Sequence, residues 1–113
     1  MATLEELQTK TQEKMDKALQ ALRNELTNIR TGRATPSLLD QVKVVNKKGE
    51  ASRVEIRNIR RDFNDAVKKQ VKAKEITEDD AKDATDFSQK LTDKYTKKID
   101  DVLAQKEKEV MAV

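Results

Sequence analysis

Apolar residues recur at alternating steps of three and four in three stretches of this 113-residue chain. Because an α-helix turns once every 3.6 residues, this spacing gathers the apolar side chains of each stretch on one helical face. We therefore predict three helices, over residues of about 3–31, 38–75 and 78–111. Their apolar stripes are Leu4, Leu7, Thr11, Met15, Ala18, Leu22, Leu26 and Ile29; then Val42, Val45, Ile56, Ile59, Phe63, Val67 and Val71; then Ala81, Ala84, Phe87, Leu91, Tyr95, Ile99, Val102 and Val110.

Residues that end or start helices separate the three stretches. Gly32 can adopt the left-handed conformation that terminates a helix, and Pro36 lacks the amide hydrogen needed to continue one. Ser37 and Thr77 can cap the next helices, because their hydroxyls accept hydrogen bonds from free amides of a first turn. Short turns, such as the one at 32–37, force neighbouring helices to run antiparallel. The predicted fold is all-α: a single-domain, monomeric, elongated, antiparallel three-helix bundle with coiled-coil-like packing.

Gly49 lies on the apolar face of the second predicted helix. A glycine inside a helix costs about 1 kcal/mol relative to alanine. We therefore expect either a close approach by another backbone at Gly49, or a helix that is frayed or kinked at this level.

The composition excludes several classes of site. The chain has no cysteine and no histidine, which removes disulfides, thiolate and imidazole metal ligands, and nucleophiles activated by an imidazole base. The acidic residues between Glu78 and Asp86 lack the spacing of a calcium loop, and helix capping explains most of them. We expect a protein that is not an enzyme and that binds no cofactor and no metal.

The composition also limits the core and the compartment. Charged residues make up 40% of the chain and aromatic residues 3%, so long helices must share thin apolar seams instead of building a thick core. No apolar run approaches the roughly 20 residues that cross a bilayer. The polar start Met1–Glu6 does not resemble a signal peptide. We expect a cytoplasmic protein that does not bind membranes.

The basic charge is concentrated in the middle of the chain. Residues 1–40 carry six Lys/Arg and six Asp/Glu, residues 41–75 carry eleven and five, and residues 76–113 carry seven and ten. The net charges of the three parts are therefore 0, +6 and −3. The second predicted helix is the one expected to meet an anionic partner.

Four arginines fall within nine residues of that helix: Arg53, Arg57, Arg60 and Arg61. At 100° per residue, Arg53, Arg57, Arg61 and Lys68 lie in one row beside the apolar face. Arg60 projects close to the border of this face, where its stem can lie on apolar neighbours and its guanidinium can be held in one direction. A planar guanidinium matches the oxygens of a phosphate. We therefore predict that the four arginines, which we call the arginine stripe, bind RNA.

The alternative interpretation is a solvated helix face whose cations are balanced by neighbouring acids, and we favour it for the lysines. For the arginines we favour phosphate recognition, since lysine would serve solubility equally well. The two Phe and one Tyr occupy predicted core positions, so unpaired bases would find no exposed aromatic platform. Structured RNA or the backbone of a duplex is the expected ligand.

Three segments of the chain, in this order, resemble the ribosome recycling factor family. They are residues 28–40 (NIRTGRATPSLLD), 54–62 (VEIRNIRRD) and 74–80 (KEITEDD). The resemblance implies a helical domain that binds the large ribosomal subunit across the tRNA sites after termination and acts with elongation factor G and GTP. It also implies that Arg30, Arg33, Arg57 and Arg60 meet ribosomal RNA. With the stripe included, the predicted RNA-binding residues are Arg30, Arg33, Arg53, Arg57, Arg60 and Arg61.

The chain departs from the family at one place. The family inserts a second, mostly β domain after the segment that matches residues 37–40, whereas here Asp40 runs through Gln41 directly into the second predicted helix. We therefore expect an isolated helical domain whose second domain is missing near residues 40–42, through a natural or an engineered deletion. The predicted junction is Ser37, Leu38, Leu39, Asp40 and Gln41.

The missing domain changes the expected activity. The family is thought to separate the subunits when elongation factor G pushes on the β domain, so this chain is expected to bind the large subunit without recycling ribosomes. The alternative, from a different class, is a structural helical bundle that binds other proteins through its apolar seams or its acidic third helix.

Overall fold

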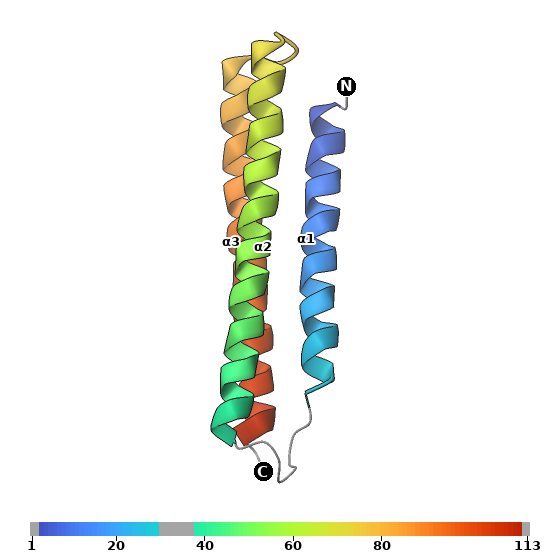
Figure 1. Cartoon of the computed structure of the whole chain (residues 1–113). Helices are drawn as coiled ribbons and strands as arrows, with labels where there is room; N and C mark the ends of the chain where they lie inside the picture. Colours follow the sequence, from blue (N-terminus) through green and yellow to red (C-terminus); the bar gives the residue numbers. More distant parts are fainter. Residues whose placement is uncertain (1–2, 30–37, 112–113) are drawn as a thin grey trace.

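The computed structural model describes residues 3–29 and 38–111, and this part of the chain forms three α-helices (Figure 1). They are α1 (Leu4–Thr27), α2 (Leu38–Lys72) and α3 (Glu78–Met111). α2 and α3 run side by side in opposite directions, and α1 lies along them with its start toward the α2–α3 turn. The bundle measures 60 × 19 × 16 Å. The predicted all-α, elongated three-helix bundle is confirmed.

The core lies where the three apolar stripes meet along the bundle axis. Every residue of the predicted stripes is buried or half-buried. The most completely buried side chains come from all three helices and include Met15, Ile56 and Tyr95. Leu19 and Leu103 are also buried in the main cluster, although the periodicity did not assign them to it. A smaller cluster toward the α2–α3 turn consists of Phe63, Val67 and Ala84, with Leu4, Leu7, Ile76, Ala81 and Phe87 packed against it.

The first helix ends at Thr27, one helical turn before its predicted end. The Asn28 amide donates to the Glu25 carbonyl (3.3 Å), and the Ile29 amide donates to the Leu26 carbonyl (3.1 Å). These bonds join residues three apart, so they tighten the last turn and interrupt the α-helical ladder. The predicted terminators and cap of this region, Gly32, Pro36 and Ser37, lie outside the described residues.

The second helix ends at Lys72 and is closed by a compact turn. The Lys74 amide donates to the Val71 carbonyl (3.0 Å) and the Glu75 amide donates to the Gln70 carbonyl (2.9 Å). This pair of bonds is the Schellman arrangement, which requires a left-handed residue after the helix. Lys74 takes that conformation, with φ of 59°. The helix therefore stops a few residues before its predicted end, because the turn uses the intervening residues.

The predicted cap of the third helix is confirmed. The Thr77 hydroxyl accepts a hydrogen bond from the Asp80 amide (3.0 Å), and the Asp80 carboxylate accepts one from the Thr77 amide (3.2 Å). This reciprocal pairing satisfies two free donors at the helix start. Glu78 and Asp79 add negative charge to the same turn, where they complement the positive end of the helix dipole.

Gly49 is buried inside an uninterrupted α2, so the helix is not frayed there, and the atoms nearest to an added Cβ belong to a side chain and not to the expected backbone. The neighbour is a side chain: a Cβ added at Gly49 would lie 2.3 Å from Leu103 Cδ1 and 2.8 Å from Leu103 Cδ2. Leu103 of α3 therefore occupies the space that any larger residue at position 49 would need. The missing Cβ makes room for the Leu103 side chain at this level.

We predict that Gly49→Ala lowers the free energy of unfolding by about 1–2 kcal/mol, because overpacking a buried contact outweighs the gain in helix propensity. In a Leu103→Ala background the same substitution should raise stability, since the added methyl group then enters empty space. Urea denaturation of the four chains measures both effects. A stabilising Gly49→Ala in the parent chain would show that Leu103 moves aside freely.

Two polar contacts join α3 to α1 and to the residues directly after α1. The Tyr95 hydroxyl donates to Asp16 Oδ1, and the buried Lys106 donates through Nζ to the Ile29 carbonyl (3.1 Å). Burial, followed by the hydrogen bond to Asp16, raises the pKa of Tyr95 to about 12. The neutral phenol is therefore the form that holds α1 in place.

We predict that stability falls as the pH rises from about 10 to about 12. The unfolded chain releases the Tyr95 proton near the ordinary pKa of 10, whereas the folded chain keeps it until about pH 12, so unfolding is favoured in this window. Tyr95→Phe, which removes only the ionisable hydroxyl, is the matched control. Thermal melts at about pH 9 and about pH 11 should show a smaller alkaline loss for Tyr95→Phe than for the parent. Equal losses would contradict the assignment.

Candidate nucleic-acid interface

The arginine stripe runs along the middle of α2 and divides into two pairs. Arg53 and Arg60 make hydrogen bonds across to α3, whereas Arg57 and Arg61 make theirs within α2. Arg53 and Arg60 are half-buried, and Arg57 and Arg61 are exposed. This division follows from helix geometry, because the first pair lies closer to the apolar face that packs against α3.

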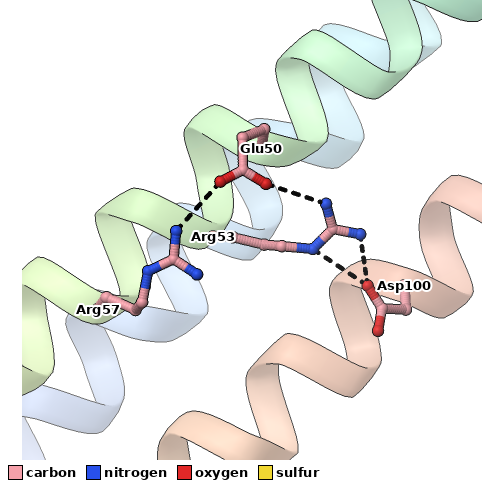
Figure 2. A network of polar contacts seen from close by, with 4 residues as sticks. All are labelled: Glu50, Arg53, Arg57 and Asp100. Atoms are coloured by element: carbon pink, nitrogen blue, oxygen red, sulfur yellow. Dashed lines mark hydrogen bonds and ion pairs between the residues drawn. The ribbon is translucent and has the colours of Figure 1, made fainter.

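Figure 2 shows Arg53 between two carboxylates. Its Nε and Nη2 donate to Asp100 Oδ1 of α3 (3.2 and 2.6 Å), and its Nη1 donates to Glu50 Oε2 (3.4 Å). The hydrogen bond to Asp100 raises the pKa of Arg53 further above its ordinary value. Glu50 also accepts from Arg57 Nη2 through Oε1 (3.1 Å), so one carboxylate connects the two arginines.

Arg60 occupies the border position that the sequence predicts. Its Nη1 donates to the amide oxygen of Gln89 on α3 (2.8 Å), and Gln89 Nε2 in turn donates to Asp93 (2.9 Å). Because Gln89 is neutral, this hydrogen bond orients the Arg60 guanidinium without pairing its positive charge with a carboxylate. Arg61 likewise donates to a neutral partner, Asn58 Oδ1 (2.9 Å).

A concavity with a volume of about 410 Å³ lies along this side of α2. Three arginines of the stripe and Lys68 line it, against a single carboxylate, Asp65. Lys68 lies beside the arginines, as its position on the predicted helix indicates, although a solvated role is the one favoured for the lysines from the sequence. Asn58 and Asn64 also line the concavity, and the sequence analysis did not predict them. A search for polar residues at helical spacing from the arginines would have found them. The lining residues are Val54, Arg57, Asn58, Arg60, Arg61, Asn64, Asp65 and Lys68.

Other predicted site residues are only partly described. Arg30, Arg33 and Ser37 lie outside the described residues. The remaining junction residues form the start of α2, where Leu39 is 63% exposed and Gln41 is buried. Arg30 and Arg33 therefore remain predictions from the sequence.

A larger concavity lies elsewhere, between α1 and α3, with a volume of about 690 Å³. Its apolar floor includes Leu26 and Val102. Arg23, Asp101 and Glu109 are among the charged side chains at its edges, so both signs of charge are present. A surface of mixed charge does not favour a polyanion, and the case for phosphate recognition stays with α2.

The part of the chain that contains α2 and α3 matches a known protein family. The model of the family described as ribosome recycling factor matches residues 41–111, which is more than half of the chain and includes the whole arginine stripe. The chain belongs to the ribosome recycling factor family.

Individual relatives give the same result for this ribosome recycling factor family member. The ribosome-recycling factor of Methylobacillus flagellatus is 58% identical over 74 residues, which cover 66% of this chain and 40% of the relative. That of Symbiobacterium thermophilum is 57% identical over 72 residues, covering 64% and 39%. That of Bacillus pumilus is 51% identical over 85 residues, covering 71% and 46%. The chain thus spans less than half the length of the curated relatives it matches.

None of the helices in the described part of this family member is long and apolar enough to cross a membrane. The same part of the chain contains no group of three or more acidic side chains placed to hold a metal ion.

Proposed function

We propose that this chain is a ribosome-binding domain that attaches to ribosomal RNA of the large subunit through α2, without catalysis and without a cofactor. The observation that carries the proposal is the concavity on α2, where Arg57, Arg60 and Arg61 lie with Lys68 against one carboxylate. Membership of the recycling factor family supports a ribosomal partner.

The contacts suit recognition of an RNA backbone. Arg57 uses one guanidinium nitrogen for Glu50, and Arg61 uses one for Asn58, which leaves further donors on each fork. Such donors bind phosphate oxygens with charge-assisted hydrogen bonds. Tyr95 and Phe63 are buried and Phe87 is half-buried, so the described aromatic rings are packed inside the bundle and are not available to stack on bases. The proposed ligand is therefore a structured RNA recognised through its phosphates.

We predict that Arg57→Ala and Arg60→Ala each weaken binding to purified large ribosomal subunits by about tenfold, because each removes a charge-assisted hydrogen bond. Each should also reduce the slope of log K against log salt by about one. Sedimentation with large subunits at several salt concentrations measures both quantities. Arg23→Ala, which removes the same charge from an exposed site on α1, is the matched control and should bind like the parent.

Arg60 needs a second measurement because it also bonds to Gln89 of α3. Thermal melting of each variant separates a loss of RNA contact from a loss of folding. If Arg57→Ala and Arg60→Ala sediment with the subunits as well as Arg23→Ala does, the arginine stripe is a solvated surface and the proposed interface is wrong.

We also propose that the β domain of the family is missing between the segments that correspond to α1 and α2. Two observations support this: α2 is continuous from Leu38, and the match to the family model begins at Gln41, directly after Asp40. On this proposal the chain occupies the factor's site on the ribosome, but elongation factor G has no second domain to act on.

We predict that the chain inhibits subunit splitting when it is added to a reaction containing an intact recycling factor and elongation factor G. The inhibition should weaken as salt rises, because the shared site is held mainly by phosphate contacts. Splitting by the chain alone would show that the helical domain suffices. Absence of competition at low salt would show that the second domain is needed even to bind.

A second candidate function is that of a protein-interaction module. Exposed apolar residues at one end of the bundle favour it. Leu38 and Leu39 at the start of α2 and Met111 at the end of α3 are 44%, 63% and 61% exposed. Binding through these residues would depend on apolar burial and would change little with salt, whereas binding through the arginine stripe would be strongly salt-dependent.

A further inference from the structure

We infer that Asp100 of α3 is a positioning residue for the RNA contact of Arg57 and acts through Arg53 and Glu50. The inference rests on the proposed function, because it concerns the same arginine stripe. Asp100 does not belong to the concavity on α2, and its role follows from the chain of contacts in Figure 2.

The contacts form one continuous path from α3 to Arg57. Asp100 Oδ1 accepts from two nitrogens of Arg53, at 2.6 and 3.2 Å, so the direction of that guanidinium is set by α3. Arg53 then holds one oxygen of Glu50 at 3.4 Å, and the other oxygen of Glu50 holds Arg57 Nη2 at 3.1 Å. Each side chain restricts the next, and Arg57 is the member of the path that lines the concavity on α2.

Arg53, in the middle of the path, is its most buried member. The Arg53 side chain is 28% exposed, whereas those of Asp100, Glu50 and Arg57 are 55%, 59% and 49% exposed. Isolated ion pairs at such a surface contribute little, but charges linked in a network restrict one another more effectively. Arg57 uses only Nη2 for Glu50, so the rest of its fork stays available for a phosphate.

Positioning of Arg57 and simple electrostatics predict different effects of neutralising Asp100 on RNA binding. Asp100 is negative, so its neutralisation by itself should make the surface more attractive to RNA. If Asp100 orders Arg57 through the path, the same substitution should weaken binding, because a loose arginine loses more conformational freedom when it contacts a phosphate. The two explanations predict opposite signs, and binding measurements can distinguish them.

The matched control is the next residue, Asp101. It is exposed, it carries the same charge, and it lines the concavity between α1 and α3 instead of contacting Arg53. We predict that Asp100→Asn weakens binding to purified large subunits by about threefold or more, whereas Asp101→Asn binds as tightly as the parent or more tightly. Sedimentation of the full chain at one fixed, low salt concentration gives both values.

Double mutants test whether the effect passes through Arg57. Asp100→Asn should cause no further loss of binding when it is combined with Arg57→Ala or with Glu50→Gln, because the path is already interrupted. Arg23→Ala, which is outside the path, should leave the effect of Asp100→Asn unchanged. A loss that arises from a loosened bundle would persist in all three backgrounds, so this cycle also separates positioning from folding.

Three outcomes overturn the inference in distinguishable ways. Equal affinities for Asp100→Asn and Asp101→Asn would show that the path does not order Arg57. A loss that persists in the Arg57→Ala background would assign Asp100 a structural role. If Arg57→Ala binds large subunits as tightly as the parent, both the proposed RNA contact of Arg57 and the positioning role of Asp100 are wrong. If Arg57→Ala binds more weakly and Asp100→Asn binds like the parent, only the positioning role is wrong.

Discussion

The apolar seam shared by the three helices is the interaction on which the rest of the structure depends. Each helix has a single narrow apolar stripe on an otherwise charged surface, so no helix can bury its stripe alone. Met15, Ile56 and Ile99 are completely buried because the stripes of all three helices face one axis. Burial spread along this axis produces a rod 60 Å long and less than 20 Å wide, and the rod leaves most of each helix surface in solvent.

The seam also determines which arginines can be held. A residue close to the seam on α2 can reach an acceptor on α3, as Arg53 and Arg60 do. A residue further around the helix cannot, so Arg57 and Arg61 find partners on α2 and stay exposed. Packing and charge are therefore combined on one helix: Arg53 and Arg60 connect α2 to α3, and Arg60 also lies with Arg57 and Arg61 in the proposed RNA surface.

The alignment of α3 along α2 links these two roles. Leu103 fills the space beside Gly49, and about one turn away Arg53 meets Asp100. Both contacts require the same axial position of α3, because a helix shifted by a turn would move Leu103 away from the only described glycine on α2. A core contact between one leucine and one glycine thus brings the carboxylate of α3 to the arginines.

Local periodicity determined much of this protein. The positions of the stripes, the all-α class, the cap at Thr77 and the border position of Arg60 all follow from 3.6-residue spacing and from side chains that bond within one turn. The end of α1 at Thr27 was missed because it depends on hydrogen bonds between residues three apart, which residue types alone do not specify.

Only the tertiary structure decided the partners of the arginines and the neighbour of Gly49. Periodicity defines which face of each helix is buried, but several axial positions of α3 would keep an apolar seam in contact with α2. The close fit of Leu103 at Gly49 distinguishes among them. The pairing of Arg53 with Asp100 and the order it gives to Glu50 and Arg57 follow from that position, so they could not be derived from the spacing of residues along one helix.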